Sequence, residues 1–346
     1  MTIGNIPKDI HRKPSRMAQI LIGYIPTTKL LGITNKAVRR RALANLFHFC
    51  MRWVLQPISE PRKKGIAMMS GDGVWRRCHP IFANFVGDYP EQALVTCTYN
   101  GRCPKCEVTP DRLGEYQTFP PHDPTSAWNT YSLCNAERHV FHAACRNTGL
   151  KPVQIPFWVS LPLTDIFLSI TPNILHQLLQ GVMKHLLSWN ISAFGPTQID
   201  AWCRAIPPNH HITHFPKGIT SLSCVSGHEH KKMYAILLGL VVDLPILGGW
   251  DSTRLVRSVC SLLDFLYLAQ YQCHTTETIA RLHEALSEFH SHKDIFMDLG
   301  IQEHFNIPKI HSLNHYIPSI RLFGTTDNYN TEQSERLHID FTKNVY

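Results

Sequence analysis

Residues 81–106 read IFANFVGDYPEQALVTCTYNGRCPKC, and two features of this stretch decide the predicted fold. The apolar run from Ile81 to Val86 predicts a buried strand, which residues 87–90 (Gly-Asp-Tyr-Pro) close with turn-forming residue types. Asp88 is therefore expected at the end of a strand, a common place for a catalytic carboxylate. Further on, Cys103 and Cys106 have the CxxC spacing of half a metal site.

The composition predicts a globular, basic protein with reduced thiols. Of its 346 residues, 44% are hydrophobic and 17% are charged, which fits a folded chain with a core. The formal net charge of +8 suits a polyanion partner such as DNA. The 11 cysteines are odd in number and the first residues do not resemble a signal peptide, so an intracellular compartment is expected. No uninterrupted stretch is suited to crossing a membrane, and the P-loop, dinucleotide-binding and nucleophile-elbow motifs are missing.

The rest of the chain is predicted to be mostly helical. Apolar residues at helical spacing predict a helix over residues 36–55, with Asn35 as its N-cap, and another over residues 175–189. Residues 66–69 are expected to form a strand. Residues 97–160 are rich in Cys, His, Pro and Gly, which is typical of an insertion held by metal. The remaining predictions are an irregular region at 190–230, two or three helices at 231–288, loop and short strand at 304–330, and a final helix at 331–345.

Several carboxylates could serve metal-dependent phosphoryl transfer. This chemistry needs acidic side chains from distant parts of the chain, because two divalent ions are held by oxygen ligands around the reacting phosphate. Asp88 is one candidate, and Glu335 in the final helix is another, with Glu332 one turn before it. Asp72 is a further candidate, although the glycines on both sides of it favour a turn.

The CxxC pair needs two more ligands to complete a four-coordinate zinc site. These could be local, since five candidates follow within the same insertion: His122, Cys134, His139, His142 and Cys145. They could also be remote, since His311 and His315 have HxxxH spacing and would lie one turn apart on one face of a helix. The chemistry of the residues does not choose between the two arrangements.

Short stretches along nearly the whole chain resemble the Plavaka family of fungal transposases, relatives of the Kyakuja-Dileera-Zisupton and CACTA groups. The matching stretches are GNIPK at 4–8, RKPS at 12–15, LIGYIP at 21–26, DYPEQ at 88–92, CPKC at 103–106, DIF at 165–167, TPNILHQL at 171–178 with Gly181, GHEH at 227–230, and YNTE at 329–332 with the sequence up to His338. Each stretch is short, but their order along one chain makes the resemblance specific.

The resemblance implies an α/β fold with an RNase H-like core of the DDE transposase and retroviral integrase type. A long, mostly α-helical insertion with a zinc knuckle interrupts this core. The implied domains are residues 1–96 and 304–346 for the core and residues 97–303 for the insertion. The implied reaction is cleavage and transfer of DNA strands at transposon ends in the nucleus, with Mg²⁺ or Mn²⁺ and an Asp-Asp-Glu triad. Asp88 matches the second acid of that triad, and a homo-oligomer is a further expectation.

The order of acid, CxxC, paired His and Glu also resembles the catalytic core of the vertebrate V(D)J recombinase. That likeness implies one Zn²⁺ site made of Cys103, Cys106, His311 and His315. Zinc bound there would help to hold the two acids on one scaffold. The same likeness favours Glu335 over Glu332 as the third acid.

Two departures from the family pattern concern activity. The family's first acid precedes the stretch at residues 4–8, where this chain starts, so a truncated and catalytically incomplete copy is expected. The family also has Asp-x-x-His where this chain has Asn173 and His176, and Asn is nearly isosteric with Asp but neutral. The leading hypothesis is therefore a transposase-derived protein that no longer cleaves DNA.

Two other functions stay open. The first is a non-catalytic, zinc-stabilised protein that binds DNA or chromatin, in which Arg39, Arg40 and Arg41, or residues 62–64 (Arg-Lys-Lys), contact phosphates. The second is a zinc-stabilised interaction protein with no role at DNA. Zinc content and affinity for DNA distinguish the three hypotheses.

Overall fold

The computed structural model describes residues 1–338 apart from Asn5, Arg12, Pro162, Pro208 and Cys224. Asn5 and Arg12 belong to the stretches that resemble the Plavaka family, and residues 339–345 to the predicted final helix, so these parts of the predictions lie outside the described residues. The chain divides into two compact units. Unit 1 comprises Met1–Val108 and Phe119–Thr171, and unit 2 comprises Thr109–Thr118 and Pro172–Tyr346. The predicted domain boundaries stay a prediction.

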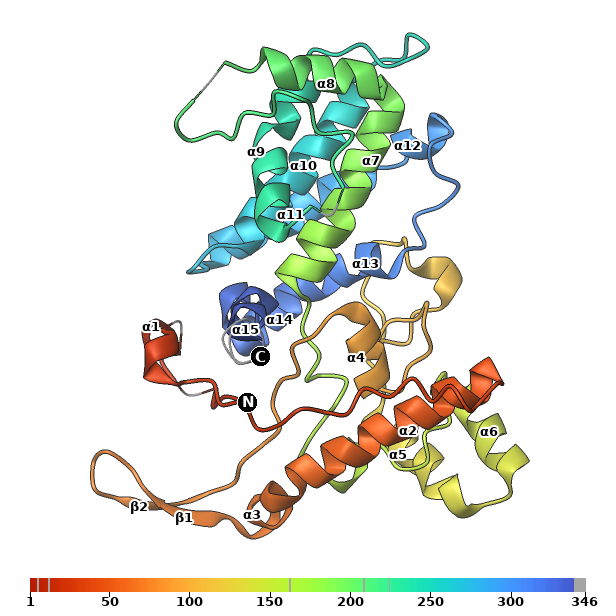
Figure 1. The fold of residues 1–346 in the computed structure, drawn as a ribbon, viewed down its shortest axis with the longest axis vertical. Helices are drawn as coiled ribbons and strands as arrows, with labels where there is room; N and C mark the ends of the chain where they lie inside the picture. Colours follow the sequence, from red (N-terminus) through yellow and green to blue (C-terminus); the bar gives the residue numbers. More distant parts are fainter. Residues whose placement is uncertain (5, 12, 162, 208, 224, 339–346) are drawn as a thin grey trace. The chain divides into compact units, whose positions relative to one another are not determined.

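Unit 1 is mainly helical, and its described sheet is a single hairpin (Figure 1). Its elements are α1 (Lys8–His11), η1 (Pro14–Arg16), α2 (Lys36–Leu55), η2 (Gln56–Ile58), α3 (Ser59–Lys64), β1 (Ile66–Met69), β2 (Trp75–Cys78), α4 (Tyr89–Val95), α5 (Pro124–Ser132), η4 (Leu133–Asn135), α6 (Arg138–Asn147) and η5 (Phe157–Ser160). The short helix η3 (Pro110–Arg112) belongs to unit 2. The core of this unit includes Val95, Phe141, Phe157 and Phe167.

Helix α2 has the bounds predicted from the sequence. The side chain of Asn35 accepts hydrogen bonds from the backbone N–H groups of Ala37 and Val38, at 3.0 and 3.1 Å, which confirms the predicted cap. On the buried side of the helix, His48 Nδ1 accepts from Phe157 N at 3.3 Å, while Nε2 donates to Leu94 O at 3.0 Å. Burial lowers the pKa of His48 to about 4, so this histidine is a neutral part of the core.

The predicted strand at residues 81–86 is wrong except for one bridge. The strand that pairs with β1 is β2, and they are antiparallel with Met69 opposite Trp75. In residues 81–86 only Phe85 pairs, in an isolated parallel bridge with Ile170. The apolar run instead packs Phe82 and Phe85, partly buried, against the core, so it needs no ladder to cover its side chains. Because the described residues form only this two-stranded sheet, the RNase H-like core stays a prediction.

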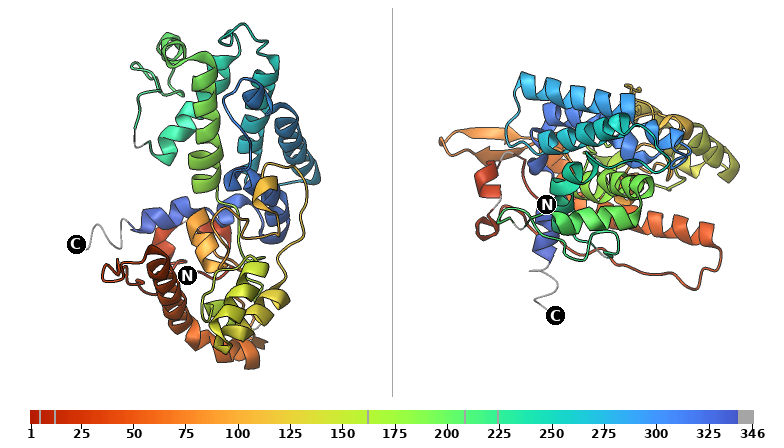
Figure 2. Two further views of the ribbon diagram at one scale, coloured as in Figure 1. Left: turned by 90° about the vertical axis from the view of Figure 1, so that its right-hand side faces the viewer. Right: turned by 90° about the horizontal axis from the view of Figure 1, so that it is seen from above.

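Unit 2 is built from helices around a second core. Its elements are η6 (Ile174–Val182, a π-helix), α7 (Met183–Phe194), α8 (Pro196–Ala205), α9 (Gly227–Val241), α10 (Thr253–Ala269), α11 (Thr276–His292), α12 (Ile295–Asp298), α13 (Pro308–His311), η7 (Ser312–His315), α14 (Tyr316–Phe323), η8 (Thr326–Asn328) and α15 (Thr331–His338). Helices α7, α9, α10 and α11 lie side by side (Figures 1 and 2) and bury Leu186, Leu237, Leu262 and Phe289 between them.

The helical predictions for unit 2 are largely confirmed, with two corrections. Helices η6 and α7 cover the predicted helix at 175–189, and α9, α10 and α11 fall in and around residues 231–288. Helix α8 lies within a region predicted to be irregular, and α13 to α14 lie within the predicted loop and strand at 304–330. Pro at the first helical turn of α8 and α13 was a start signal in the sequence. Within the described part of the chain, no helix has the length and apolar character needed to span a bilayer.

Candidate functional site

The CxxC pair sits in a tight knuckle of unit 1. Cys103 and Cys106 are both 3% exposed, and the backbone N–H of Lys105 donates to Cys103 Sγ at 3.3 Å. His122, a candidate for a local ligand, donates from Nε2 to Cys103 O at 2.9 Å, and its own N–H donates to Lys105 O at 3.1 Å. Its ring therefore supports the backbone of the knuckle.

The paired histidines lie on one helical stretch of unit 2. Pro308 starts α13, and His311 and His315 follow one turn apart in α13 and η7, with ring centres 5.1 Å apart. His311 is buried and His315 is half-buried. The HxxxH stretch is helical, as the remote arrangement required, so the two rings lie on the same face of the helix.

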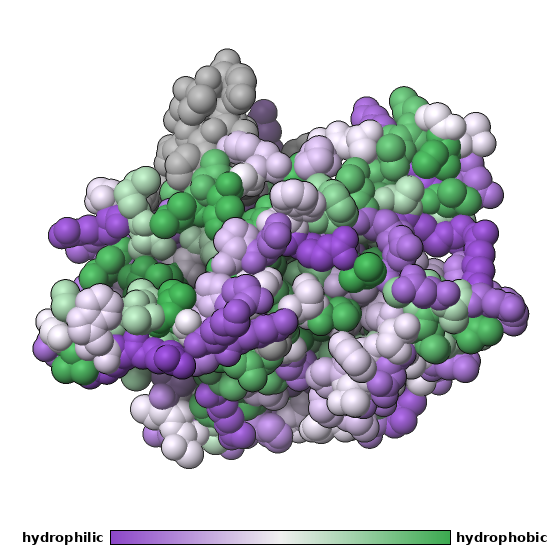
Figure 3. All heavy atoms as spheres, turned by 90° about the horizontal axis from the view of Figure 1, so that it is seen from below, coloured by the Kyte–Doolittle hydropathy of each residue, from purple (hydrophilic) through white to green (hydrophobic). Residues whose placement is uncertain are grey.

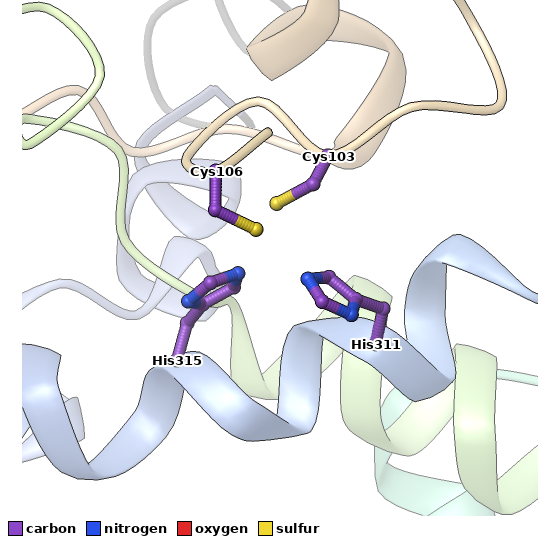
Figure 4. A group of neighbouring side chains, drawn as sticks. All are labelled: Cys103, Cys106, His311 and His315. Atoms are coloured by element: carbon purple, nitrogen blue, oxygen red, sulfur yellow. The ribbon is translucent and has the colours of Figure 1, made fainter. Parts of the chain in front are cut away.

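Cys103, Cys106, His311 and His315 form one group that could hold a metal ion (Figure 4). Their ligand atoms all lie within 4.8 Å of one another. Ligands bound at 2.0–2.3 Å in a tetrahedral zinc site lie roughly 3.3–3.8 Å apart, so only a pair near the 4.8 Å limit would have to approach by about 1 Å on binding. Two thiolates and two imidazoles suit zinc. In this group of described residues, the CxxC pair is completed by the two remote histidines, His311 and His315. The local candidates are not part of it: Cys134, His139, His142 and Cys145.

The protonation of the knuckle bears on metal binding. Burial, followed by the adjacent Cys106 thiol, raises the pKa of Cys103 well above its usual value. A metal ion must therefore displace thiol protons when it binds. Burial also lowers the pKa of Lys105 to about 8, and its Nζ donates to the carbonyl oxygens of Leu168, at 3.3 Å, and Ile170. These carbonyl groups thus stabilise the buried ammonium group of Lys105, which lies between the two cysteines in the sequence.

A short segment after the knuckle is held firmly within unit 2. Gly114 N donates to Asn306 Oδ1 at 3.0 Å, and the ring of Tyr116 stacks on His290 with centres 4.9 Å apart. A Cβ at Gly114 would lie 2.8 Å from the carbonyl carbon of Phe305, so this close approach requires glycine. The segment Thr109–Thr118 is therefore fixed next to the residues that lead into α13.

Asp88 caps helix α4 and does not end a strand, which corrects its predicted setting. Its Oδ1 accepts from Glu91 N at 2.9 Å, and Glu91 Oε2 accepts from Asp88 N at 3.3 Å, which makes a capping box. The next residue, Tyr89, accepts from Gly101 N at 2.8 Å and donates to Arg102 O at 2.9 Å. The start of α4 is thus tied to the loop that carries Cys103. The Asp-x-x-Glu spacing and Pro90 were a visible signal for this helix.

Glu335 lies beside His176 within unit 2. His176 Nε2 and Glu335 Oε1 are 2.5 Å apart, and the two side chains are 30% and 47% exposed. They come from η6 and α15, which are 159 residues apart in the sequence at this contact. This contact links two segments that are far apart in the sequence and fixes the orientation of one Glu335 oxygen at a solvent-accessible position.

Asn173 holds these two elements together. Its Oδ1 accepts from His176 N at 3.1 Å, which caps η6, and its Nδ2 donates to Thr331 Oγ1 in the first turn of α15 at 2.9 Å. Tyr316 OH donates to Asn173 O at 3.1 Å, and Asn173 is only 1% exposed. Every polar group of this residue is therefore used, and Asn173 positions both His176 and the start of the helix that carries Glu335.

The other two acidic candidates have structural partners. Glu332 pairs with Lys231 at 2.8 Å and also accepts from Asn330 Nδ2 at 3.1 Å. Asp72 lies in the exposed turn between β1 and β2, where Arg76, its ion-pair partner at 2.7 Å, lowers the pKa of the carboxyl group. The turn expected from the flanking glycines is present. Asp88 belongs to unit 1 and Glu335 to unit 2.

A sequence model described as Plavaka transposase matches residues 1–190, which is more than half of the chain. The matched region contains Asp88, the CxxC pair, Asn173 and His176. No curated protein matches the chain. No solved structure matches it either. The chain belongs to the Plavaka transposase family.

Proposed function

We propose that this chain is a transposase-derived protein that binds DNA and keeps two acids of a metal-dependent nuclease, Asp88 and Glu335. The family match carries this proposal. The placement of His176, a motif residue in the matched region, at 2.5 Å from Glu335 supports it independently. Two-metal phosphoryl transfer in the ancestor would cleave DNA strands and join them at transposon ends. The nucleus is the proposed compartment, and a homo-oligomer is the proposed assembly.

The residues present suit a hard divalent cation. Carboxylate oxygens are the ligands that Mg²⁺ and Mn²⁺ prefer, and the Glu335 side chain is 47% exposed and can be reached from solvent. Such ions would polarise the phosphate and activate the attacking group. His176 orients one oxygen of Glu335, and the capping box orients Asp88 at the start of α4. Glu332 is the weaker candidate because Lys231 already neutralises it.

We further propose that the 346-residue chain binds DNA without cleaving it. By the resemblance, Asn173 stands where the family has Asp. A neutral amide does not supply the negative charge that an aspartate would offer to a metal ion or a proton at this position. Asn173 is also committed to structural hydrogen bonds, which favours a role in stability over one in catalysis.

The second candidate is a non-catalytic DNA- or chromatin-binding protein stabilised by zinc. The group of two cysteines and two histidines favours it, since a closed four-ligand site of this kind serves structure. Zinc would then be the only metal with a role. The two candidates share DNA as partner and differ in whether Asp88 and Glu335 bind divalent ions.

The test combines binding, cleavage and metal analysis on the purified chain. We expect binding to a labelled duplex that weakens steeply as salt rises, no nicking of supercoiled plasmid with Mg²⁺ or Mn²⁺, and about one zinc per chain. Mn²⁺ binding followed by electron paramagnetic resonance should weaken in Glu335→Gln and stay unchanged in Glu303→Gln, an exposed control.

Each result has a clear meaning. Nicking that depends on Glu335 would show that the chain is an active nuclease and overturn the proposed inactivity. Equal Mn²⁺ binding by Glu335→Gln and the wild type would favour the purely zinc-stabilised binder. If the protein contains zinc but has no affinity for DNA at low salt, only the hypothesis of a zinc-stabilised interaction protein remains.

A further inference from the structure

Positive charge is concentrated in one continuous part of unit 1. Residues 36–78, from the start of α2 to the end of β2, contain ten Lys or Arg and two Asp or Glu, a net charge of +8. The whole chain has 34 Lys or Arg and 26 Asp or Glu, which is also +8. The other 303 residues therefore carry 24 charges of each sign and sum to zero. We call residues 36–78 the basic segment.

Most cations of the basic segment are not neutralised within the protein. Arg62 is buried, and Lys64 and Arg76 are held in ion pairs at 2.9 and 2.7 Å with acidic residues of the same segment. The other seven have no ion pair with a residue that the structure describes: Lys36, Arg39, Arg40, Arg41, Arg52, Lys63 and Arg77. A surface of this kind attracts polyanions, and contact with phosphates releases the counterions condensed on a nucleic acid.

The same segment of the sequence also carries exposed aromatic rings. Trp53 and Trp75 are 64% and 67% exposed, and Phe49 is 49% exposed. Phe49 and Trp53 are one turn apart on α2, and the guanidinium carbon of Arg52 lies 5.7 Å from the centre of the Phe49 ring. Figure 3, a space-filling view, shows hydrophilic and hydrophobic residues interleaved over the face that it draws.

The hairpin of β1 and β2 is exposed on both faces. None of its eight strand residues is buried, and Met69, opposite Trp75, is 62% exposed. A two-stranded hairpin without a covering layer is marginally stable in water, so a partner that covers it would stabilise it. Basic side chains beside exposed rings are the combination that binds the backbone of a nucleic acid strand and stacks on its bases.

We propose that the basic segment is a DNA-binding surface that takes DNA with unpaired bases next to a duplex. Its Lys and Arg side chains contact phosphates, and the rings of Trp53 and Trp75 stack on unpaired bases. In an intact duplex each base is covered by its neighbours, so the rings have no base face to contact, whereas an unpaired stretch exposes these faces. The inference rests on the proposed function and deepens it, because it names the form of DNA and the surface that binds it.

The first arm of the test concerns the rings. The full-length chain is titrated against three labelled DNA probes of one sequence: a duplex, a single strand, and a duplex with an unpaired overhang. The wild type should bind the overhang probe most tightly. Trp53→Ala with Trp75→Ala should weaken that binding about tenfold or more and change duplex binding less than about twofold. Trp53→Phe with Trp75→Phe should retain most of the affinity, and Trp250→Ala, a 50% exposed tryptophan of unit 2, is the matched control.

The second arm concerns the charges. Arg40→Gln with Arg77→Gln should weaken binding to all three probes and reduce the salt slope by about two. Lys217→Gln, an exposed cation of unit 2, should leave both unchanged. All of these side chains are exposed, so circular dichroism and the thermal midpoint should show that the variants fold.

The outcomes separate this inference from the proposed function. If the wild type binds DNA and the basic-segment variants bind equally well, the surface lies elsewhere and the inference is wrong, while the proposed function stands. If only the arginine variants weaken binding, base stacking is wrong. Equally tight binding to single-stranded RNA or to anionic vesicles would contradict the choice of DNA. No binding of any DNA at low salt would overturn both proposals.

Discussion

Asn173 illustrates how one buried side chain can position two functional segments. It caps η6, which carries His176, and hydrogen bonds to Thr331 at the start of α15, which carries Glu335. The position is 1% exposed, where a charged group would lose most of its hydration. A neutral amide can both donate and accept there, which a carboxylate cannot. The amide therefore makes these hydrogen bonds without the cost of burying a charge.

Replacement of Asn173 tests this role. Asn173→Ala removes a helix cap and leaves Thr331 without its buried partner at 2.9 Å, so the free energy of unfolding should fall by about 2 kcal/mol or more. Chemical denaturation measures the loss. Asn35→Ala removes only an exposed cap of α2 and should cost about 1 kcal/mol. Equal losses in the two variants would argue against the structural role of Asn173.

His48 predicts a dependence of stability on pH. Burial lowers its pKa to about 4 in the folded chain, whereas the unfolded chain has the ordinary value of 6.5. The unfolded state therefore binds the proton more readily, and acid favours unfolding. The contribution of His48 is fully present above pH 6.5 and is lost as the pH falls toward 4, by up to about 3 kcal/mol.

Urea denaturation between pH 7 and pH 4 measures this effect. His48→Gln removes the titrating group, so the variant should start from a lower stability at pH 7 and lose less of it on acidification. A fall in stability of the same size in the wild type and the variant would show that other groups control the acid response.

At the scale of elements, α13 and η7 decide the candidate metal site. Residues 304–330 lack a long apolar period, and a loop with a short strand was predicted for them. They form helices because Pro308 starts a turn and because Ile310, Tyr316 and Ile320 are buried in the core of unit 2. Tertiary packing thus supplies the stability that the local pattern does not show. The helical turn brings His311 and His315 onto one face.

Removal of metal tests the candidate site that these histidines form with the CxxC pair. A chelator should lower the thermal midpoint by at least about 5 °C, because bound zinc contributes to folding free energy. Cys106→Ser should show the lower midpoint at once and respond little to the chelator. Cys273→Ser changes an exposed cysteine outside the group and should behave like the wild type.

The result can contradict the site in two ways. An unchanged midpoint after chelation, with no zinc found by elemental analysis, would show that the four residues hold no structural metal. Zinc that survives in Cys106→Ser would show that the metal is bound elsewhere.

At the scale of the whole molecule, charge and hydrophobic burial are distributed differently. Each unit has its own core, with Phe157 in that of unit 1 and Phe265 in that of unit 2. The net charge of +8, by contrast, is carried by residues 36–78 alone. Burial stabilises both units, while only one of them presents an excess of cations. If the basic residues were spread evenly along the chain, charge would not indicate which unit binds DNA. Here the excess of cations favours unit 1.

The sequence by itself determined the features that depend on neighbouring residues. The bounds and cap of α2, the strand β1 and the helices of residues 227–292 follow from helical periodicity, capping residues and turn residues close to one another in the chain. The CxxC and HxxxH pairs were visible for the same reason. The capping box at Asp88 was also local, but the apolar run before it favoured a strand, and that prediction was wrong.

Only the tertiary structure decided how distant segments meet. The contacts of Asn173 with Thr331 and of His176 with Glu335 join residues 158 and 159 positions apart, and no local pattern contains them. The same is true of the choice of His311 and His315 over His122 to complete the group with the cysteines. The physical reason is that local signals reflect the conformational preferences of adjacent residues. Long-range partners are chosen by the burial of side chains, which depends on the packing of the folded chain.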